Sequence, residues 1–188
     1  DLHLNYLPMA HLMERSATYT MIVHNAQVAI FGGDYSKLKD DLSFWKPTIF
    51  VSVPRIYNRF YDSIIKKTTE MKDKLVGRFL KHCIDTKLQN YEESGTISHR
   101  IYDALVFKKM RNVLGGRVRF MVSGSAPIDP KVAKLLMVCF CVPFVEGYGQ
   151  TETSGTSFVM HPKDTTLGHV GGVKEFLEFK LVDVPEMN

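Results

Sequence analysis

The alternation of short apolar segments with longer helical segments constrains the fold of this chain more than any other feature. Residues 27–53 read as strand, helix and strand, and residues 118–149 repeat that order. Glycine or proline ends most of these segments, so the connecting turns are short. Strands joined in this way by helices form βαβ units with a parallel sheet. The sequence therefore predicts an α/β fold with a largely parallel sheet and flanking helices.

The boundaries of the predicted elements follow from the apolar pattern and the turn residues. Strands are expected at 4–8, 27–31, 48–53, 118–124 and 175–184, and residues 143–149 are expected to form a strand and its exit loop. Helices are expected at 10–26, 36–45 and 131–142. The first helix has the composition of a buried one, and the last has Asp129 as N-cap and Pro130 in its first turn. The aromatic-rich segment around Trp45 is expected in the core.

A helical block at 55–114 separates the two strand–helix–strand units. Apolar residues recur four apart in 55–93, which predicts one amphipathic helix or a pair of helices. Residues 92–98 break this stretch, and Ser98 is expected to cap a further helix. A pair of glycines at 115–116 should end that helix.

Composition limits the classes of function. The chain has 188 residues and 45% hydrophobic content, which is enough for one domain with a core. The net charge of +4 is dispersed, so nucleic-acid binding is not expected. No apolar run reaches the roughly 18 residues of a membrane span. The three cysteines lack C-x-x-C spacing, which argues against disulfides and zinc and predicts a reducing, cytoplasmic compartment.

Two polar, glycine-rich segments follow neighbouring strands of the predicted sheet. Residues 123–127 (SGSAP) end the strand at 118–124, and residues 146–152 (EGYGQTE) end the strand at 143–149. Parallel strands joined by one helix place their carboxyl ends on the same edge, where open α/β sheets bind ligands. We therefore expect these two loops to emerge side by side.

The two loops together offer groups suited to a nucleoside triphosphate. Residues 124–127 combine a glycine, two small side chains and a proline, which leaves room for a flat ring. Tyr148 adds a planar side chain, and Thr151 adds a hydroxyl for a phosphate oxygen. Glu152 is a carboxylate of the kind that Mg²⁺ takes alongside nucleotide phosphates. The residues alone leave two interpretations open, a nucleotide site and a pair of ordinary turns.

Other candidate residues are weaker from the pattern alone. His11 lies early in an apolar helix, where a packed core histidine is more common than a ligand. Glu14 and Arg15 are expected to form surface or interhelix pairs. Ser123 and Ser125 do not stand in a G-x-S-x-G motif, which argues against a serine hydrolase. No H-x-x-x-H spacing occurs, so a histidine-based zinc site is not expected.

Six segments, in order along nearly the whole chain, resemble the adenylate-forming (AMP-binding) enzymes, and specifically the long-chain fatty acyl-CoA synthetases. They are 5–15 (NYLPMAHLMER), 46–62 (KPTIFVSVPRIYNRFYD), 101–119, 115–128 (GGRVRFMVSGSAPI), 146–152 and 168–187. The resemblance implies a two-step ligase. ATP and a fatty acid give an acyl-adenylate and pyrophosphate, and coenzyme A then displaces AMP to give the thioester.

The resemblance also implies roles for particular residues. Those that line the adenine and ribose are Gly124, Ser125, Ala126 and Pro127, and those that pack against the adenine are Glu146, Gly147 and Tyr148. Gly149 and Gln150 border the acyl site. Catalytic roles are implied for Thr151, which holds the phosphate, for Glu152, which holds Mg²⁺, and for His11, which lies next to the carboxylate and pyrophosphate.

The family's phosphate loop and its C-terminal domain with the catalytic lysine have no counterpart in this sequence. We therefore expect residues 1–188 to be an internal part of one large N-terminal AMP-binding domain, with little or no ligase activity when isolated. Two rival functions stay open: another acyl- or aryl-adenylating ligase, and a non-catalytic adenine-nucleotide-binding module. A third is a membrane-surface module at 55–93, which has nine Lys or Arg against six Asp or Glu. Peripheral association of the parent enzyme with the cytosolic face of the endoplasmic reticulum is an open alternative to a purely cytoplasmic location.

Overall fold

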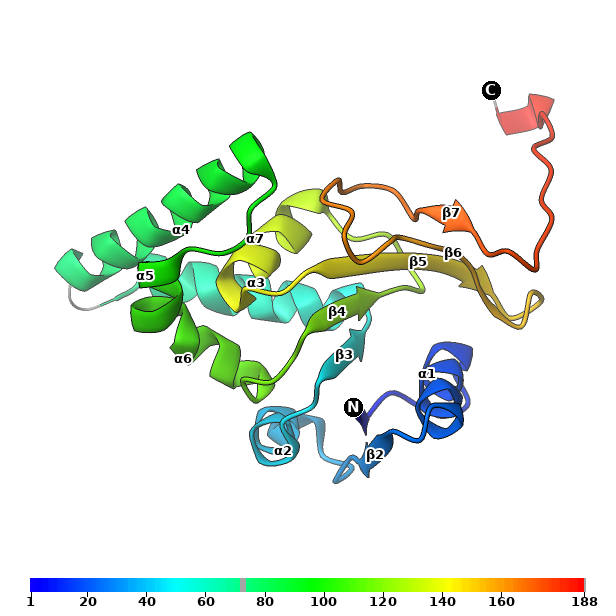
Figure 1. Cartoon of the computed structure of the whole chain (residues 1–188), viewed down its shortest axis with the longest axis horizontal. Coiled ribbons are helices and arrows are strands. Elements are labelled where there is room, and N and C mark those ends of the chain that lie inside the picture. The colour runs from blue at the N-terminus through cyan, green and yellow to red at the C-terminus, as the bar shows by residue number, and fades with distance from the viewer. Residues whose placement is uncertain (72–73, 188) are drawn as a thin grey trace.

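The structure, a computed structural model, describes residues 1–71 and 74–187, and its centre is a seven-stranded sheet (Figure 1). The strand order is β2-β1-β3-β4-β5-β6-β7. The strands are β1 (Leu2–Asn5), β2 (Gln27–Ile30), β3 (Ile49–Ser52), β4 (Phe120–Ser123), β5 (Phe144–Gln150), β6 (Gly155–Val159) and β7 (Gly172–Val173). The first five strands pair in parallel, and β6 and β7 are added antiparallel. The prediction of a largely parallel α/β sheet is confirmed.

Helices connect the parallel strands. They are α1 (Leu12–Val23), α2 (Leu38–Trp45), α3 (Pro54–Thr69), α4 (Lys74–Ser94), α5 (Arg100–Tyr102), α6 (Lys108–Arg111) and α7 (Pro130–Phe140). Short 3₁₀ or π segments are η1 (Tyr35–Lys37), η2 (Asp103–Phe107), η3 (Asn112–Leu114) and η4 (Pro185–Met187). None of the helices in the described part of the chain is long and apolar enough to cross a membrane.

The helical block at 55–114 contains the predicted pair of helices, α3 and α4. Residues 72–73, between the two helices, lie outside the described residues. The expected cap at Ser98 is displaced by one residue. His99 caps α5, and its Nδ1 accepts a hydrogen bond of 3.3 Å from the Tyr102 N–H. The helical segment then continues through the π-helical turn of η2. It ends, as expected, at Gly115, whose backbone is in the left-handed region.

The two faces of the sheet are covered by different helices. Side chains alternate between the faces of a strand, and in β1 the His3 side chain contacts α1 whereas Leu4 joins the main core. On that core side, Tyr57 of α3 lies edge-on against Phe50 of β3 and Phe144 of β5. Helix α7 packs against α3 and α4, and Figure 1 shows these three helices as a group apart from α1.

A buried ion pair holds the helical block together. The Lys87 side chain on α4 is fully buried, and its ammonium lies 2.6 Å from the Asp103 carboxylate of η2. The same ammonium lies 3.1 Å from the Cys141 Sγ and 4.4 Å from the centre of the Phe107 ring. Burial alone would raise the pKa of the Asp103 carboxyl, but its hydrogen bonds with Lys87 and the His99 N–H hold that pKa below its ordinary value.

Several boundary predictions are wrong. No strand forms at 175–184, where Phe176 and Leu181 are exposed, and the described sheet ends at β7. The first strand begins and ends earlier than predicted, and α1 is not buried, since only three of its residues, Glu14, Thr18 and Met21, are inaccessible. Trp45 and its neighbour Phe44 lie largely at the surface rather than in the core.

Candidate functional site

The ends of β4 and β5 lie side by side, as predicted from the crossover. Ser123 of β4 is in register with Glu146 of β5. The next residue, Gly124, lies so close to β5 that an added Cβ would be 3.3 Å from the Gly147 carbonyl oxygen and 3.6 Å from the Met13 sulfur of α1. The absence of a side chain at Gly124 therefore allows two strand ends and one helix to meet at this edge of the sheet.

The turn after Gly124 presents its side chains to solvent. Ser125 has a φ of +70°, in the left-handed region, and its hydroxyl donates to the Met13 sulfur at 3.5 Å. Residues 126–127 are exposed. Asp129 then accepts a bond from the Lys131 N–H and caps α7, so the predicted helix start is confirmed. A strand end and a capped helix thus hold the turn at 124–127 from both sides.

Glu146 is a buried carboxylate beneath this turn. It is 6% exposed, and its Oε2 accepts the backbone N–H of Ile128 at 3.1 Å. Burial raises the pKa of the Glu146 carboxyl above its ordinary value, and the Ile128 hydrogen bond and the charge of His169 offset part of that rise. Glu146 therefore ties β5 to the 124–127 turn through a bond to the main chain.

The segment expected to be an exit loop is instead a strand. Residues 147–150 continue β5 and pair antiparallel with β6, and the register shifts between Tyr148 and Gly149. A Cβ at Gly149 would lie 2.0 Å from the Gly155 carbonyl oxygen, so the bulge requires glycine. The prediction erred because this segment has no alternating apolar pattern, and its pairing depends on β6, which sequence reasoning missed.

The residues at the end of β5 are exposed. Tyr148 is 45% exposed, its ring lies edge-on to Phe158, and its hydroxyl accepts a bond of 2.8 Å from the Gln150 side chain. Thr151 and Glu152 lie in the solvent-exposed turn that joins β5 to β6. The two side chains are therefore accessible, on a hairpin whose base is fixed in the sheet.

His11 lies at the amino end of α1, on the surface rather than in the core. It caps the helix, and its Nδ1 accepts the Met13 N–H at 3.2 Å. Further along α1, the Ser16 hydroxyl lies 3.2 Å from where a Gly155 Cβ would be. Helix α1 therefore runs from the 124–127 turn to the β5–β6 hairpin.

The structure brings together the 124–127 turn, the middle of β5 and the first turns of α1. Thr151 and Glu152 extend beyond this group. At about 3.3 Å per extended residue, Thr151 lies on the order of 15 Å further along β5 than Glu146. The turn at 124–127 and the hairpin tip thus lie toward the same edge of the sheet, but the hairpin tip extends further in the direction of β5. Met13, which touches both Gly124 and Ser125, has no signal in the sequence that could have marked it.

A metal at this site would have to share its coordination with a ligand. Within residues 1–71 and 74–187, no group of three or more His, Cys, Asp or Glu side chains is placed to hold a metal ion. Mg²⁺ in nucleotide sites is bound by one or two carboxylates together with phosphate oxygens and water. The single exposed carboxylate of Glu152, next to the Thr151 hydroxyl, fits that donor set.

The sequence profile of the AMP-binding enzymes matches residues 1–188. This chain belongs to the AMP-binding enzyme family. Within the family, it is 43% identical over 188 residues to the peroxisomal long chain acyl-CoA synthetase 6 of Arabidopsis thaliana. It is 40% identical to fatty acyl-CoA synthetase A of Dictyostelium discoideum and 39% identical to human long-chain-fatty-acid–CoA ligase 1. Each comparison covers 100% of this chain but only 26%, 28% and 26% of the relative.

Solved structures of the family share the fold. The adenylation domain of a carboxylic acid reductase from Segniliparus rugosus, solved with AMP and a co-purified carboxylic acid, aligns with 99% of this AMP-binding chain at a TM-score of 0.65 and 25% identity. The alignment covers 25% of that chain. The N-terminal domain of FACL13 from Mycobacterium tuberculosis aligns with 94% of this chain and 34% of its own, at a TM-score of 0.58 and 17% identity.

Proposed function

We propose that this chain carries part of the ATP and acyl site of a long-chain fatty acyl-CoA synthetase. The parent enzyme would activate a fatty acid with ATP to an acyl-adenylate and transfer the acyl group to coenzyme A. One observation carries the proposal. The Gly124 turn lies directly against the Gly147 backbone, so the two segments that resemble the family's nucleotide motifs form one surface.

The adenine and ribose would lie against the β4–α7 turn and β5. The side chains that follow Gly124 are small and exposed at Ser125 and Ala126, which leaves room for a ring, and the exposed Tyr148 can stack beside one. The remaining residues of this part of the site are Gly124, Pro127, Glu146 and Gly147. Gly149 and Gln150, which follow on the same strand, would border the acyl group.

The hairpin tip and the start of α1 would hold the charged end of the nucleotide. Thr151 would donate its hydroxyl to a phosphate oxygen, Glu152 would bind Mg²⁺, and His11 would lie beside the fatty-acid carboxylate and the pyrophosphate. When bound, Mg²⁺ neutralises phosphate charge as the carboxylate attacks the α-phosphorus. This reaction needs charge neutralisation and in-line placement rather than a nucleophilic side chain, and an exposed hydroxyl and carboxylate on a fixed hairpin are suited to that task.

The other elements of the reaction belong to the parent enzyme. The parent enzyme would supply the phosphate loop and a C-terminal domain with the catalytic lysine. Residues 1–188 would form part of its large N-terminal domain. The parent enzyme would act in the cytoplasm, and its contact with the cytosolic face of the endoplasmic reticulum would be peripheral. Co-sedimentation with anionic vesicles should then weaken at high salt, because screened surface charges attract less.

The experiment is Glu152→Ala in the full-length enzyme, with Glu93→Ala as the matched control. Glu93 is an exposed carboxylate on α4, in the helical block. We expect acyl-adenylate formation, measured by ATP–pyrophosphate exchange, to fall sharply in the Glu152 variant at limiting Mg²⁺ and to recover partly at high Mg²⁺. Unchanged exchange in the Glu152 variant would overturn its role in holding Mg²⁺, and a full-length protein that binds nucleotide without any exchange would argue for a non-catalytic module. Activity across acyl chain lengths would separate a long-chain enzyme from other adenylating ligases.

A further inference from the structure

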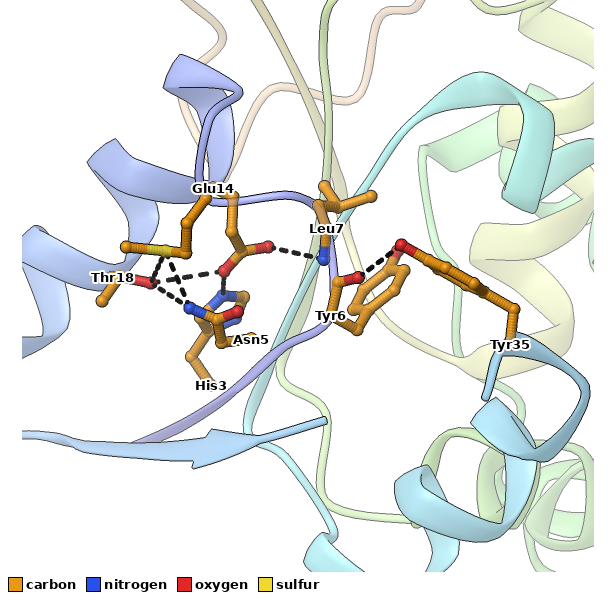
Figure 2. A network of polar contacts seen from close by, with 8 residues as sticks. His3, Asn5, Tyr6, Leu7, Glu14, Thr18 and Tyr35 are labelled. Carbon is orange, nitrogen blue, oxygen red and sulfur yellow. Dashed lines mark hydrogen bonds and ion pairs between the residues drawn. The ribbon is translucent and has the colours of Figure 1, made fainter. Parts of the chain in front are cut away.

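A buried polar network joins β1 to α1 and lies outside the proposed site (Figure 2). At its centre is Glu14, a carboxylate with no solvent exposure. Its Oε1 lies 2.6 Å from Nε2 of His3, which is 1% exposed, and 3.3 Å from the Thr18 hydroxyl. Its Oε2 accepts the backbone N–H of Leu7 at 3.1 Å. The expectation of a surface or interhelix pair for Glu14 was therefore wrong.

These three contacts hold the Glu14 carboxyl in a fixed position. The Leu7 N–H donates to Oε2 and the Thr18 hydroxyl donates to Oε1, which also shares a hydrogen bond with the His3 ring. Glutamine has one side-chain oxygen in place of two, so if it keeps the Leu7 bond, its NH₂ group replaces the oxygen that accepts the Thr18 hydroxyl. Full burial also excludes direct contact between Glu14 and a ligand.

The network fastens the loop between β1 and α1 at several points. Leu7 is bound through its amide, and the Tyr6 carbonyl accepts the Tyr35 hydroxyl at 3.0 Å (Figure 2). The Met9 carbonyl accepts the Arg15 guanidinium at 3.3 Å. The loop therefore cannot shift without breaking bonds to α1, and it delivers the chain to His11 at the start of that helix.

The same helix touches the proposed site one residue before Glu14. Met13 contacts Gly124 and Ser125, and His11 caps the helix two residues earlier. A displacement of Glu14 would therefore move both Met13 and His11 relative to the β4–α7 turn. Because reacting groups must be held close to their productive geometry, a shift of about 1 Å can reduce a rate about a hundredfold.

We propose that His3 and Glu14 are positioning residues for adenylate formation, which set the start of α1 and His11 against the Gly124–Ser125 turn. This inference rests on the proposed function. The pair acts through Met13, His11 and the 6–11 loop, and it makes no contact with ATP or the fatty acid. Its effect should therefore appear in kcat of the adenylation half-reaction and not in the KM for coenzyme A.

The test is Glu14→Gln in the full-length enzyme, with Asp103→Asn as the matched control. Asp103 is also a carboxylate in a buried ion pair, but it lies in the helical block. We expect ATP–pyrophosphate exchange per folded enzyme to fall about tenfold to a hundredfold in Glu14→Gln. Asp103→Asn should lose stability but keep its exchange rate. Hydrogen exchange at the Leu7 amide should speed up only in the Glu14 variant.

Thr18→Val keeps the shape of that side chain and removes one donor to Glu14. It provides a milder variant if Glu14→Gln does not fold, and it should lower kcat by a smaller factor with the KM for coenzyme A unchanged. If the wild type is active and both Glu14→Gln and Thr18→Val keep its kcat, the inference is overturned. An equal loss of ATP–pyrophosphate exchange in Asp103→Asn would overturn it as well. A wild type that forms no acyl-adenylate would instead overturn the proposed function, and the positioning role with it.

Discussion

Gly149→Ala tests whether the β5–β6 hairpin fixes the turn that carries Thr151 and Glu152. An added Cβ would lie 2.0 Å from the Gly155 carbonyl oxygen, 2.6 Å from its carbon and 2.8 Å from the Thr156 Cα. Ordinary Cβ contacts begin at 3.4 Å, so the shortfall at the oxygen exceeds 1 Å. All three atoms belong to the main chain and cannot rotate away. The two strands must therefore move apart at the bulge.

The expected cost follows from that shift. Overpacking of a closely packed position costs about 1–3 kcal/mol, and a clash with main-chain atoms belongs at the upper end, about 3 kcal/mol. A displacement of about 1 Å at the base of the hairpin would also move Glu152, which can reduce the adenylation rate about a hundredfold. Urea unfolding of the chain gives the first quantity, and ATP–pyrophosphate exchange by the full-length enzyme gives the second.

Gly172→Ala is the matched control, because it makes the same substitution in the neighbouring part of the sheet. An added Cβ at Gly172 of β7 would meet no atom within 4 Å. Its free energy of unfolding should change by no more than about 0.5 kcal/mol. If Gly149→Ala is as mild as Gly172→Ala in both assays, the close packing of Gly149 against Gly155 does not hold the hairpin.

Two further predictions concern buried charges. Burial raises the pKa of Glu146 above its ordinary value of 4.5, so the folded chain holds this proton more tightly than the unfolded chain does. The resulting contribution to the free energy of unfolding is present at low pH and is lost as the pH rises through the raised pKa. Glu146→Gln, whose amide oxygen can still accept the Ile128 N–H, should flatten this decline in urea unfolding across pH, and an unchanged pH profile would contradict it. Lys87→Met leaves Asp103 without its partner, so it should cost about 3–5 kcal/mol in the same assay. It should also weaken the loss of stability on acidification that comes from the lowered pKa of Asp103, because the His99 N–H remains as its partner; a stability equal to wild type would show that the pair is dispensable.

The parallel half of the sheet could be predicted because each strand is a short apolar run bounded by turn residues. β3 and β4, for example, were expected within a few residues of their observed bounds, and their neighbouring helices follow from the connection rules. The antiparallel half could not be predicted in the same way. The β6 segment Gly155–Val159 is short and partly polar, and it becomes a strand only because the end of β5 lies beside it.

The burial of Glu14 shows a second limit of sequence reasoning. The segment around it, HLMER, places a histidine, a glutamate and an arginine within five residues, which is typical of a solvated helix start. Its partner His3 lies in β1 and faces α1, a placement that depends on how the helix crosses the sheet. Periodicity describes one element at a time, whereas a buried polar contact between two elements depends on their packing.

The glycines of the site illustrate what a motif leaves unexplained. The resemblance implies that Gly124 contacts adenosine, but the structure gives it a second requirement, because a side chain there would crowd the Gly147 carbonyl oxygen. At Gly149 that structural requirement is more severe, since no side chain fits beside Gly155 whether or not a ligand is bound. Loss of activity on substitution of either glycine would therefore not by itself demonstrate ligand contact. The side chain of Glu152 is exposed in the hairpin turn, so its substitution reports on the chemistry most directly.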